Sequence, residues 1–189
     1  SPPALALPPM RQLAERTDTV FIERCAHVLA RELQCLGVTM NFAPVVDVDT
    51  NPDNPIIGDR AFGADPETVV TFARAVLEGF RAGGVLSCLK HFPGHGDTLL
   101  DSHLALPSVL HERARLEAVE LLPFQRLAAH ADSVMTAHVV YPALDAGPAT
   151  LSKKIVSGLL RERFGFEGVV FSDDLEMKGI AGEQAPEAA

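Results

Sequence analysis

The chain has 189 residues, of which 47% are hydrophobic and 22% charged, and its formal net charge at pH 7 is −9. A chain of this length and composition can bury a core as one domain, which excludes global disorder. The acidic excess argues against nucleic acid or an anionic membrane as the main partner and favours a small or neutral substrate.

Cysteine usage and hydropathy indicate the cellular environment. The three cysteines, Cys25, Cys35 and Cys88, are odd in number, and the first two fall in one expected helix, so we expect no disulfide framework. No apolar run approaches the ~18 residues that a membrane-spanning helix needs, and the N-terminus has no signal-peptide pattern. We therefore expect no membrane partner and a cytoplasmic location.

The N-terminal elements begin with a proline-rich segment. Four prolines within residues 1–17 predict an extended lead-in without a regular helix. From Asp18, which suits an N-cap, apolar residues at three- and four-residue spacing predict a helix that Gly37 ends. The apolar run 38–46 then predicts a strand that is buried on both faces of a parallel sheet.

The middle of the chain continues the alternation of helices and strands. A long polar loop, from about residue 50 to 64, precedes a helix over 65–83, which has Asp at its cap, Pro at its first position and Gly at its end. A strand is expected at 85–91. The third helix, over roughly 111–130, is expected to be interrupted at Pro123.

Two further strands and a helix complete the pattern. We expect a strand at 133–140, then a helix that Ser152 caps and that runs to about residue 164, and then a strand at 168–172. The segment 179–189 is polar and small, and predicts a frayed end.

The alternation of helix and strand predicts an α/β fold with a parallel sheet in one domain unit over 18–178. Four strands are too few to close a (β/α)8 barrel, so we expect an incomplete barrel, with a complete open sheet of four or five strands as the alternative. Active sites of α/β proteins usually lie at the carboxyl ends of the parallel strands, and polar residues of this chain are predicted to gather there. They are Asp47, Asp49, Lys90, His91, His138, Asp173 and Asp174.

The richest cluster of titratable groups is the segment 90–107, KHFPGHGDTLLDSHLALP, with three histidines and two aspartates. In this segment Asp101 lies two residues before His103. A carboxylate so close can hold one ring nitrogen, which makes the histidine a proton donor and acceptor near neutral pH. The alternative interpretation is a turn in which Asp101 accepts hydrogen bonds from local amides.

The last strand, which we expect to be buried, delivers Asp173 and Asp174. Alternation along a strand directs one of them into the site, where a carboxylate can act as nucleophile, electrostatic stabiliser or metal ligand. Either can instead cap a following helix.

A metal site is an alternative for the histidine cluster. The candidate ligands are His91, His95, His103, Asp97 and Asp101. Their spacing matches no zinc pattern, and the chain contains no phosphate-binding or dinucleotide-binding fingerprint, so we expect neither a metal nor a cofactor.

Six ordered segments resemble one enzyme family. The pattern KHFPGHGDT-x-x-DSH-x-x-LP is similar to the signature of bacterial β-N-acetylglucosaminidases of glycoside hydrolase family 3. The remaining segments also resemble that family in order, across residues 35–179. They are NFAPVVDV, GDRAFG, MTAHVVYPALD, PATLS and GVVFSDDLEM.

The resemblance implies a (β/α)8 barrel that removes terminal β-linked N-acetylglucosamine from peptidoglycan or chitin fragments with retention of configuration, without a cofactor. It implies that Asp173 is the nucleophile, that His103 is the general acid and base, and that Asp101 supports His103. Arg60 in GDRAFG and the pair Lys90 and His91 resemble the sugar-binding residues of that family. A protonated histidine replaces the second carboxylate that most retaining glycosidases use.

The chain departs from the family pattern at both ends. A strand ending in an Asp-x-Glu-Gly-Gly-Arg type of run, and a last barrel strand, are absent from these 189 residues. We therefore expect the segment alone to be weakly active or inactive. A phosphorylase is an alternative, because a histidine does not repel incoming phosphate, and a non-catalytic glycan-binding remnant is another.

Overall fold

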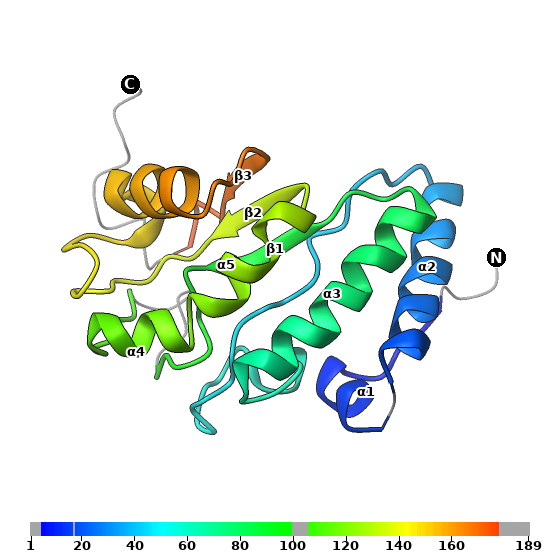
Figure 1. Ribbon diagram of the computed structural model, residues 1–189, viewed down its shortest axis with the longest axis horizontal. Coiled ribbons are helices and arrows are strands. Elements are labelled where there is room, and N and C mark those ends of the chain that lie inside the picture. Colours follow the sequence, from blue (N-terminus) through cyan, green and yellow to red (C-terminus); the bar gives the residue numbers. More distant parts are fainter. Residues whose placement is uncertain (1–4, 17, 100–105, 178–189) are drawn as a thin grey trace.

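The computed structural model describes residues 5–16, 18–99 and 106–177. Its centre is a sheet of three parallel strands in the order β1-β2-β3, with helices between consecutive strands (Figure 1). The strands are β1 (Cys88–Phe92), β2 (Ser133–Thr136) and β3 (Val169–Ser172). The expected α/β fold with a parallel sheet is therefore confirmed.

The segment 40–46 runs beside β1 but is not the regular strand that the sequence predicts. Two isolated parallel bridges, Met40 to Leu86 and Val45 to Lys90, join it to the chain around β1. Pro44 has no N–H group to donate to a ladder, which explains the interruption. The expectation of burial on both faces is also wrong, since the Phe42 side chain is 46% exposed.

Two long helices, α2 (Thr19–Cys35) and α3 (Pro66–Gly83), lie side by side on one flank of the sheet (Figure 1). Their starts are as predicted: the carboxylates of Asp18 and Asp65 each accept a backbone N–H at 2.8 Å. The helices meet closely, because a Cβ on Gly79 would lie 2.6 Å from Cβ of Ala26. A larger residue there would push the two helices apart.

The proline-rich start contains a helix, contrary to prediction. Helix α1 (Met10–Arg16) begins directly after Pro9, whose carbonyl accepts the N–H of Leu13 at 3.1 Å. Prolines that precede the first turn do not remove any intrahelical hydrogen bond, so they do not prevent the helix. The expected frayed segment 179–189 lies outside the described residues.

The helices of the C-terminal half follow the predicted order. The helix expected at 111–130 is divided, as predicted, and Pro123 lies in the first turn of its second part. Ser152 Oγ accepts the N–H of Ile155 at 3.1 Å, which confirms its role at the next helix start. The elements of this half are α4 (Arg113–Ala118), α5 (Leu122–Leu127), the 3₁₀ turns η2 (Ala128–His130) and η3 (Ala149–Leu151), and the π-helical η4 (Lys154–Arg163). A further 3₁₀ turn, η1 (Gly58–Arg60), lies earlier in the chain, between α2 and α3.

The strands differ in burial. Every residue of β2 is buried, whereas β3 forms an exposed edge on which Val169 is 52% exposed. The expectation that a buried strand delivers Asp173 is therefore wrong for the described part of the chain. Along 5–16, 18–99 and 106–177, no helix is long and apolar enough to cross a membrane.

Candidate active site

A cavity of about 470 Å³ lies at the carboxyl ends of the strands. It brings together the sequence-predicted residues Arg60, Lys90, His91 and Asp173. Its lining consists of Phe42, Ile56, Ile57, Arg60, Lys90, His91, His95, Met135, Ser172, Asp173 and Asp174. The predicted proton-transfer pair, Asp101 and His103, lies outside the described residues.

Two cations reach the cavity from different elements. Arg60 ends the 3₁₀ turn η1, and its Nη1 donates to the carbonyl of Ile56 at 3.0 Å. Lys90 lies in β1, where burial and the nearby Arg60 charge lower the pKa of its ammonium group, while Asp173 opposes the shift. The cavity lining therefore contains two hydrogen-bond donors, Arg60 and Lys90, and the Asp173 carboxylate lies near Lys90.

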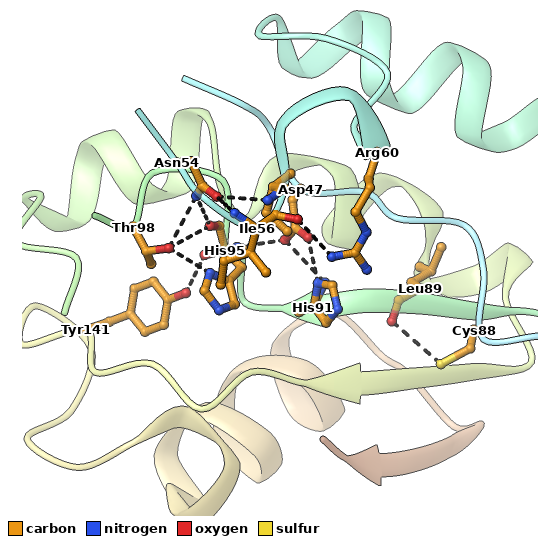
Figure 2. A network of polar contacts seen from close by, with 12 residues as sticks. Asp47, Asn54, Ile56, Arg60, Cys88, Leu89, His91, His95, Thr98 and Tyr141 are labelled. Atoms are coloured by element: carbon orange, nitrogen blue, oxygen red, sulfur yellow. Dashed lines mark hydrogen bonds and ion pairs between the residues drawn. The ribbon is translucent and has the colours of Figure 1, made fainter. Parts of the chain in front are cut away.

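Asp47 lies beside His91 and is fully buried (Figure 2). Its Oδ1 accepts the backbone N–H groups of His91 at 3.2 Å and His95 at 2.6 Å, and its Oδ2 lies 2.7 Å from Nδ1 of His91. Burial alone would raise the pKa of Asp47, but the charges and hydrogen bonds of His91 and His95 outweigh it and lower that pKa. The carboxylate therefore stays ionised and holds both histidines.

The turn after β1 is fixed by side chains from a distant loop (Figure 2). Asn54 Nδ2 donates to the carbonyl of His95 at 2.9 Å, while Asn54 Oδ1 accepts the N–H groups of Ile56 and Ile57 at 2.9 and 2.8 Å. Nδ1 of His95 lies 2.8 Å from Oγ1 of Thr98. The loop that carries Arg60 is thus tied to the turn that carries His95.

Two close backbone approaches complete this frame. A Cβ on Gly96 would overlap the carbonyl oxygen of Val48, so only glycine fits there. The hydroxyl of the buried Tyr141 donates to the carbonyl of Gly94. The glycines of the sequence Gly94-His95-Gly96 therefore allow the backbone to pack closely at this turn.

The end of β3 positions the two aspartates differently. The N–H of Asp173 donates to the carbonyl of Thr136 at 3.2 Å, and Oδ1 of Asp173 accepts the N–H of Asp174 at 2.9 Å. Oδ1 of Asp174 accepts the N–H of Glu176 at 2.9 Å and so caps the next turn. Both line the cavity, but Asp174 is exposed and Asp173 only half-exposed.

His138 supports this strand end from below. It is fully buried, and its Nε2 lies 2.9 Å from the carbonyl oxygen of Asp174, to which it must donate. Its Nδ1 lies 2.8 Å from Oγ1 of Thr150. His138 therefore connects β2 with the turn that carries the two aspartates.

The sequence predicts that Asp47 lies at a strand end but indicates no role for it. It also indicates no role for Asn54, Thr98 or Tyr141. The only local signal for Asp47 is its position after an apolar run.

A second carboxylate–histidine pair, Asp97 with His111, also joins residues far apart in the sequence. Within the part of the chain that the structure describes, no group of three or more His, Cys, Asp or Glu is arranged to hold a metal ion.

Comparison with known proteins assigns a family. The glycosyl hydrolase family 3 N-terminal domain matches residues 4–189. The beta-hexosaminidase of Chromobacterium violaceum is 45% identical over 183 residues, which cover 93% of this chain and 51% of that protein. The beta-hexosaminidase A of Pseudoalteromonas piscicida is 43% identical, and the match covers 86% of this chain but 29% of that protein.

Solved structures agree with the sequence comparisons. A glycoside hydrolase family 3 beta-N-acetylglucosaminidase from Paenibacillus sp. str. FPU-7 superposes with a TM-score of 0.92 at 44% identity, covering 95% of this chain and 35% of that one. NagZ from Neisseria gonorrhoeae, in complex with N-trifluoroacetyl-D-glucosamine, superposes with a TM-score of 0.86 at 41% identity, covering 93% and 54%.

The expected barrel type is confirmed by these likenesses: the three-stranded sheet and its helices are part of a TIM-barrel-type domain. The chain spans about half the length of the beta-hexosaminidases from Chromobacterium violaceum, Pseudomonas aeruginosa, Thiobacillus denitrificans and Xylella fastidiosa, and less than a third of the beta-hexosaminidase A named above. It belongs to the glycosyl hydrolase family 3 N-terminal domain family.

Proposed function

We propose that this chain supplies the catalytic pocket of a β-N-acetylhexosaminidase that removes terminal β-linked N-acetylglucosamine. The observation that carries the proposal is the cavity of about 470 Å³ in which the half-exposed Asp173 carboxylate lies with Arg60, Lys90 and His91. The names of the relatives support the activity. The Neisseria gonorrhoeae complex supports a sugar of the N-acetylglucosamine class, because its ligand is an analogue of that sugar.

The proposed reaction has two steps. Asp173 attacks the anomeric carbon and forms a glycosyl-enzyme ester, while the leaving oxygen takes a proton from His103 and departs as the free alcohol. Water then attacks the same carbon and gives its proton to His103. This attack breaks the ester bond and releases Asp173 as a carboxylate. Asp101 supports His103 through both steps. The support for His103 and Asp101 is their DSH motif.

The remaining predicted residues bind sugar in this proposal. Arg60 and Lys90 have only hydrogen-bond donors to offer, so they suit oxygen atoms of the sugar ring substituents. Lys90 also lies near Asp173, and a cation there attracts the attacking carboxylate. Substrates from peptidoglycan or chitin, a cytoplasmic location and a role in peptidoglycan recycling belong to the same proposal and rest on the family resemblance.

The stereochemical course of hydrolysis tests the reaction. We expect the whole protein to release N-acetylglucosamine from an aryl N-acetyl-β-glucosaminide first as the β-anomer, which proton NMR distinguishes before mutarotation. The α-anomer as first product would contradict the Asp173 ester. No release by the whole protein would contradict the activity itself.

A parallel assay separates hydrolysis from phosphorolysis. The same reaction is run with and without phosphate, and we expect free sugar at the same rate in both. Accumulation of sugar 1-phosphate would instead identify the phosphorylase alternative. Comparing this 189-residue chain with the whole protein tests the expectation that the segment alone is weakly active.

A further inference from the structure

The buried Asp47 carboxylate has an unusual division of its hydrogen bonds. Oδ1 accepts two backbone N–H groups, from His91 at 3.2 Å and His95 at 2.6 Å. Oδ2 faces a single side-chain atom, Nδ1 of His91, at 2.7 Å. Figure 2 shows Asp47 directly beside the His91 ring. An ionised carboxylate has no hydrogen to give, so Nδ1 must carry the proton of this contact.

The other ring nitrogen of His91 is left for the cavity. Nε2 has no hydrogen-bond partner within residues 5–16, 18–99 and 106–177. It is also not sealed in the interior, because Oδ1 of Asp49 is the only fully buried side-chain nitrogen or oxygen atom without a partner in those ranges. His91 lines the cavity, and Nδ1 is the ring nitrogen that faces Asp47.

We propose that Asp47 is a positioning residue that holds His91 in the Nδ1-protonated tautomer, so that Nε2 presents a hydrogen-bond acceptor to a substrate hydroxyl. The proposal deepens the proposed function and rests on it for the identity of the substrate. Asp47 is shielded from the cavity and does not touch substrate. Its effect is transmitted through the His91 ring.

This arrangement has a consequence for specificity. Arg60 and Lys90, which line the same cavity, can only donate hydrogen bonds. Both would therefore bind a carboxylate or phosphate oxygen as well as a sugar oxygen. With Nδ1 protonated, an acceptor at Nε2 of His91 favours a group that also has a hydrogen to donate. A sugar hydroxyl satisfies both demands, whereas an ionised carboxylate or an O-methyl ether satisfies only the first.

An isosteric substitution inverts the tautomer. In Asp47→Asn the amide oxygen must face the two backbone N–H groups of His91 and His95, because the reversed amide would set its NH₂ against two donors. The NH₂ group then faces Nδ1 of His91 and requires an acceptor there. The ring proton moves to Nε2, and the cavity loses its acceptor while the shape of the site is kept.

The first measurement needs no substrate. Nitrogen-15 NMR of the histidine rings in the whole protein, at a pH where His91 is neutral, reports which ring nitrogen carries the proton. We expect Nδ1 in the wild type and Nε2 in Asp47→Asn. A wild-type ring protonated on Nε2 would overturn the proposal even if Asp47→Asn does not fold, and so would an unchanged tautomer in a folded Asp47→Asn.

The second measurement uses turnover of an aryl N-acetyl-β-glucosaminide. We expect Asp47→Asn to raise KM by ~10- to 100-fold, with a smaller change in kcat, because an unmatched donor at Nε2 weakens sugar binding. A flipped tautomer with an unchanged KM would also overturn the proposal. If the wild type does not turn over the substrate, the proposed function fails, while the NMR result still decides the tautomer.

Asp49→Asn is the matched control. It makes the same chemical change two residues away, at a carboxylate that pairs with Arg11 at 2.5 Å and does not line the cavity. We expect it to leave the His91 tautomer and KM unchanged. A KM increase as large as that of Asp47→Asn would show that loss of charge at this strand end, and not the tautomer, is responsible.

Discussion

Asp47 and Asp173 both follow an extended segment at the same edge of the sheet, but their surroundings differ. Asp47 is fully buried, and both of its oxygens face N–H groups of His91 and His95. Asp173 is half-exposed, lines the cavity, and has one oxygen engaged by the N–H of Asp174. A carboxylate whose oxygens are occupied orients its donors, whereas one with an open oxygen can attack a substrate.

The comparison shows that position at a strand end identifies candidates but does not assign roles. Hydrogen-bond occupancy supports the roles proposed for Asp173 and Asp47, because a nucleophile needs an accessible lone pair and a positioning group needs saturated contacts. Substitutions of the two classes of residue are therefore expected to differ in their effects on activity and on stability.

The largest effect is expected for Asp173→Asn. Loss of the nucleophile should lower kcat/KM on an aryl N-acetyl-β-glucosaminide by roughly 10⁴-fold, since the ester can no longer form. The free energy of unfolding should change by less than about 0.5 kcal/mol, because the side chain is half-exposed and the amide oxygen can still accept the N–H of Asp174. Near-normal turnover would remove Asp173 from the nucleophile role, and Asp174→Asn should be far less damaging.

A second prediction concerns the frame around Asp47. Gly96→Ala would set a Cβ against the carbonyl of Val48, and neither backbone can yield easily. We expect a loss of about 1–3 kcal/mol in the free energy of unfolding, measured by urea titration. Gly147→Ala is the control, since a Cβ there meets nothing within 4 Å. Equal stability of the two variants would show that the turn around His95 is not tightly packed.

Local signals explain the parts of the fold that the sequence predicts well. Asp18, Asp65 and Ser152 begin their helices as expected, because a cap needs only its own side chain and an N–H three residues on. The strand-end cluster is also predictable, since parallel strands share one edge. Arg60, Lys90, His91 and Asp173 accordingly line one cavity.

Non-local contacts explain what the sequence does not predict. Hydrogen bonds join Asp47 to His91 across 44 residues and Asn54 to His95 across 41, and no periodicity encodes such pairs. The irregular pairing of segment 40–46 and the exposure of β3 likewise depend on neighbours in space. The sequence does not predict helix α1, because prolines that precede a helix and prolines in an extended segment have the same local pattern.

A third prediction concerns the support beneath Asp173. His138→Leu removes the donor to the carbonyl of Asp174 in a fully buried position. We expect it to destabilise the protein by about 1–2 kcal/mol and to lower kcat/KM by ~10-fold, as the turn with Asp173 loses its anchor. His138→Gln, whose Nε2 can replace the histidine Nε2, should restore part of both. If Gln and Leu behave alike, the donor does not position this turn.

The smallest expected effect is a pH dependence of stability caused by His95. Burial lowers its pKa in the folded protein, with Asp47 opposing the shift. The unfolded chain therefore binds a proton that the folded protein does not, so the stability from neutral His95 is complete above pH 6.5 and is lost as the pH falls below it. Urea midpoints between pH 8 and pH 5.5 should fall by the equivalent of, at most, about 1 kcal/mol per pH unit. His95→Asn, which can keep a contact with Thr98 but does not titrate, should flatten this dependence; an unchanged slope would assign it to other histidines.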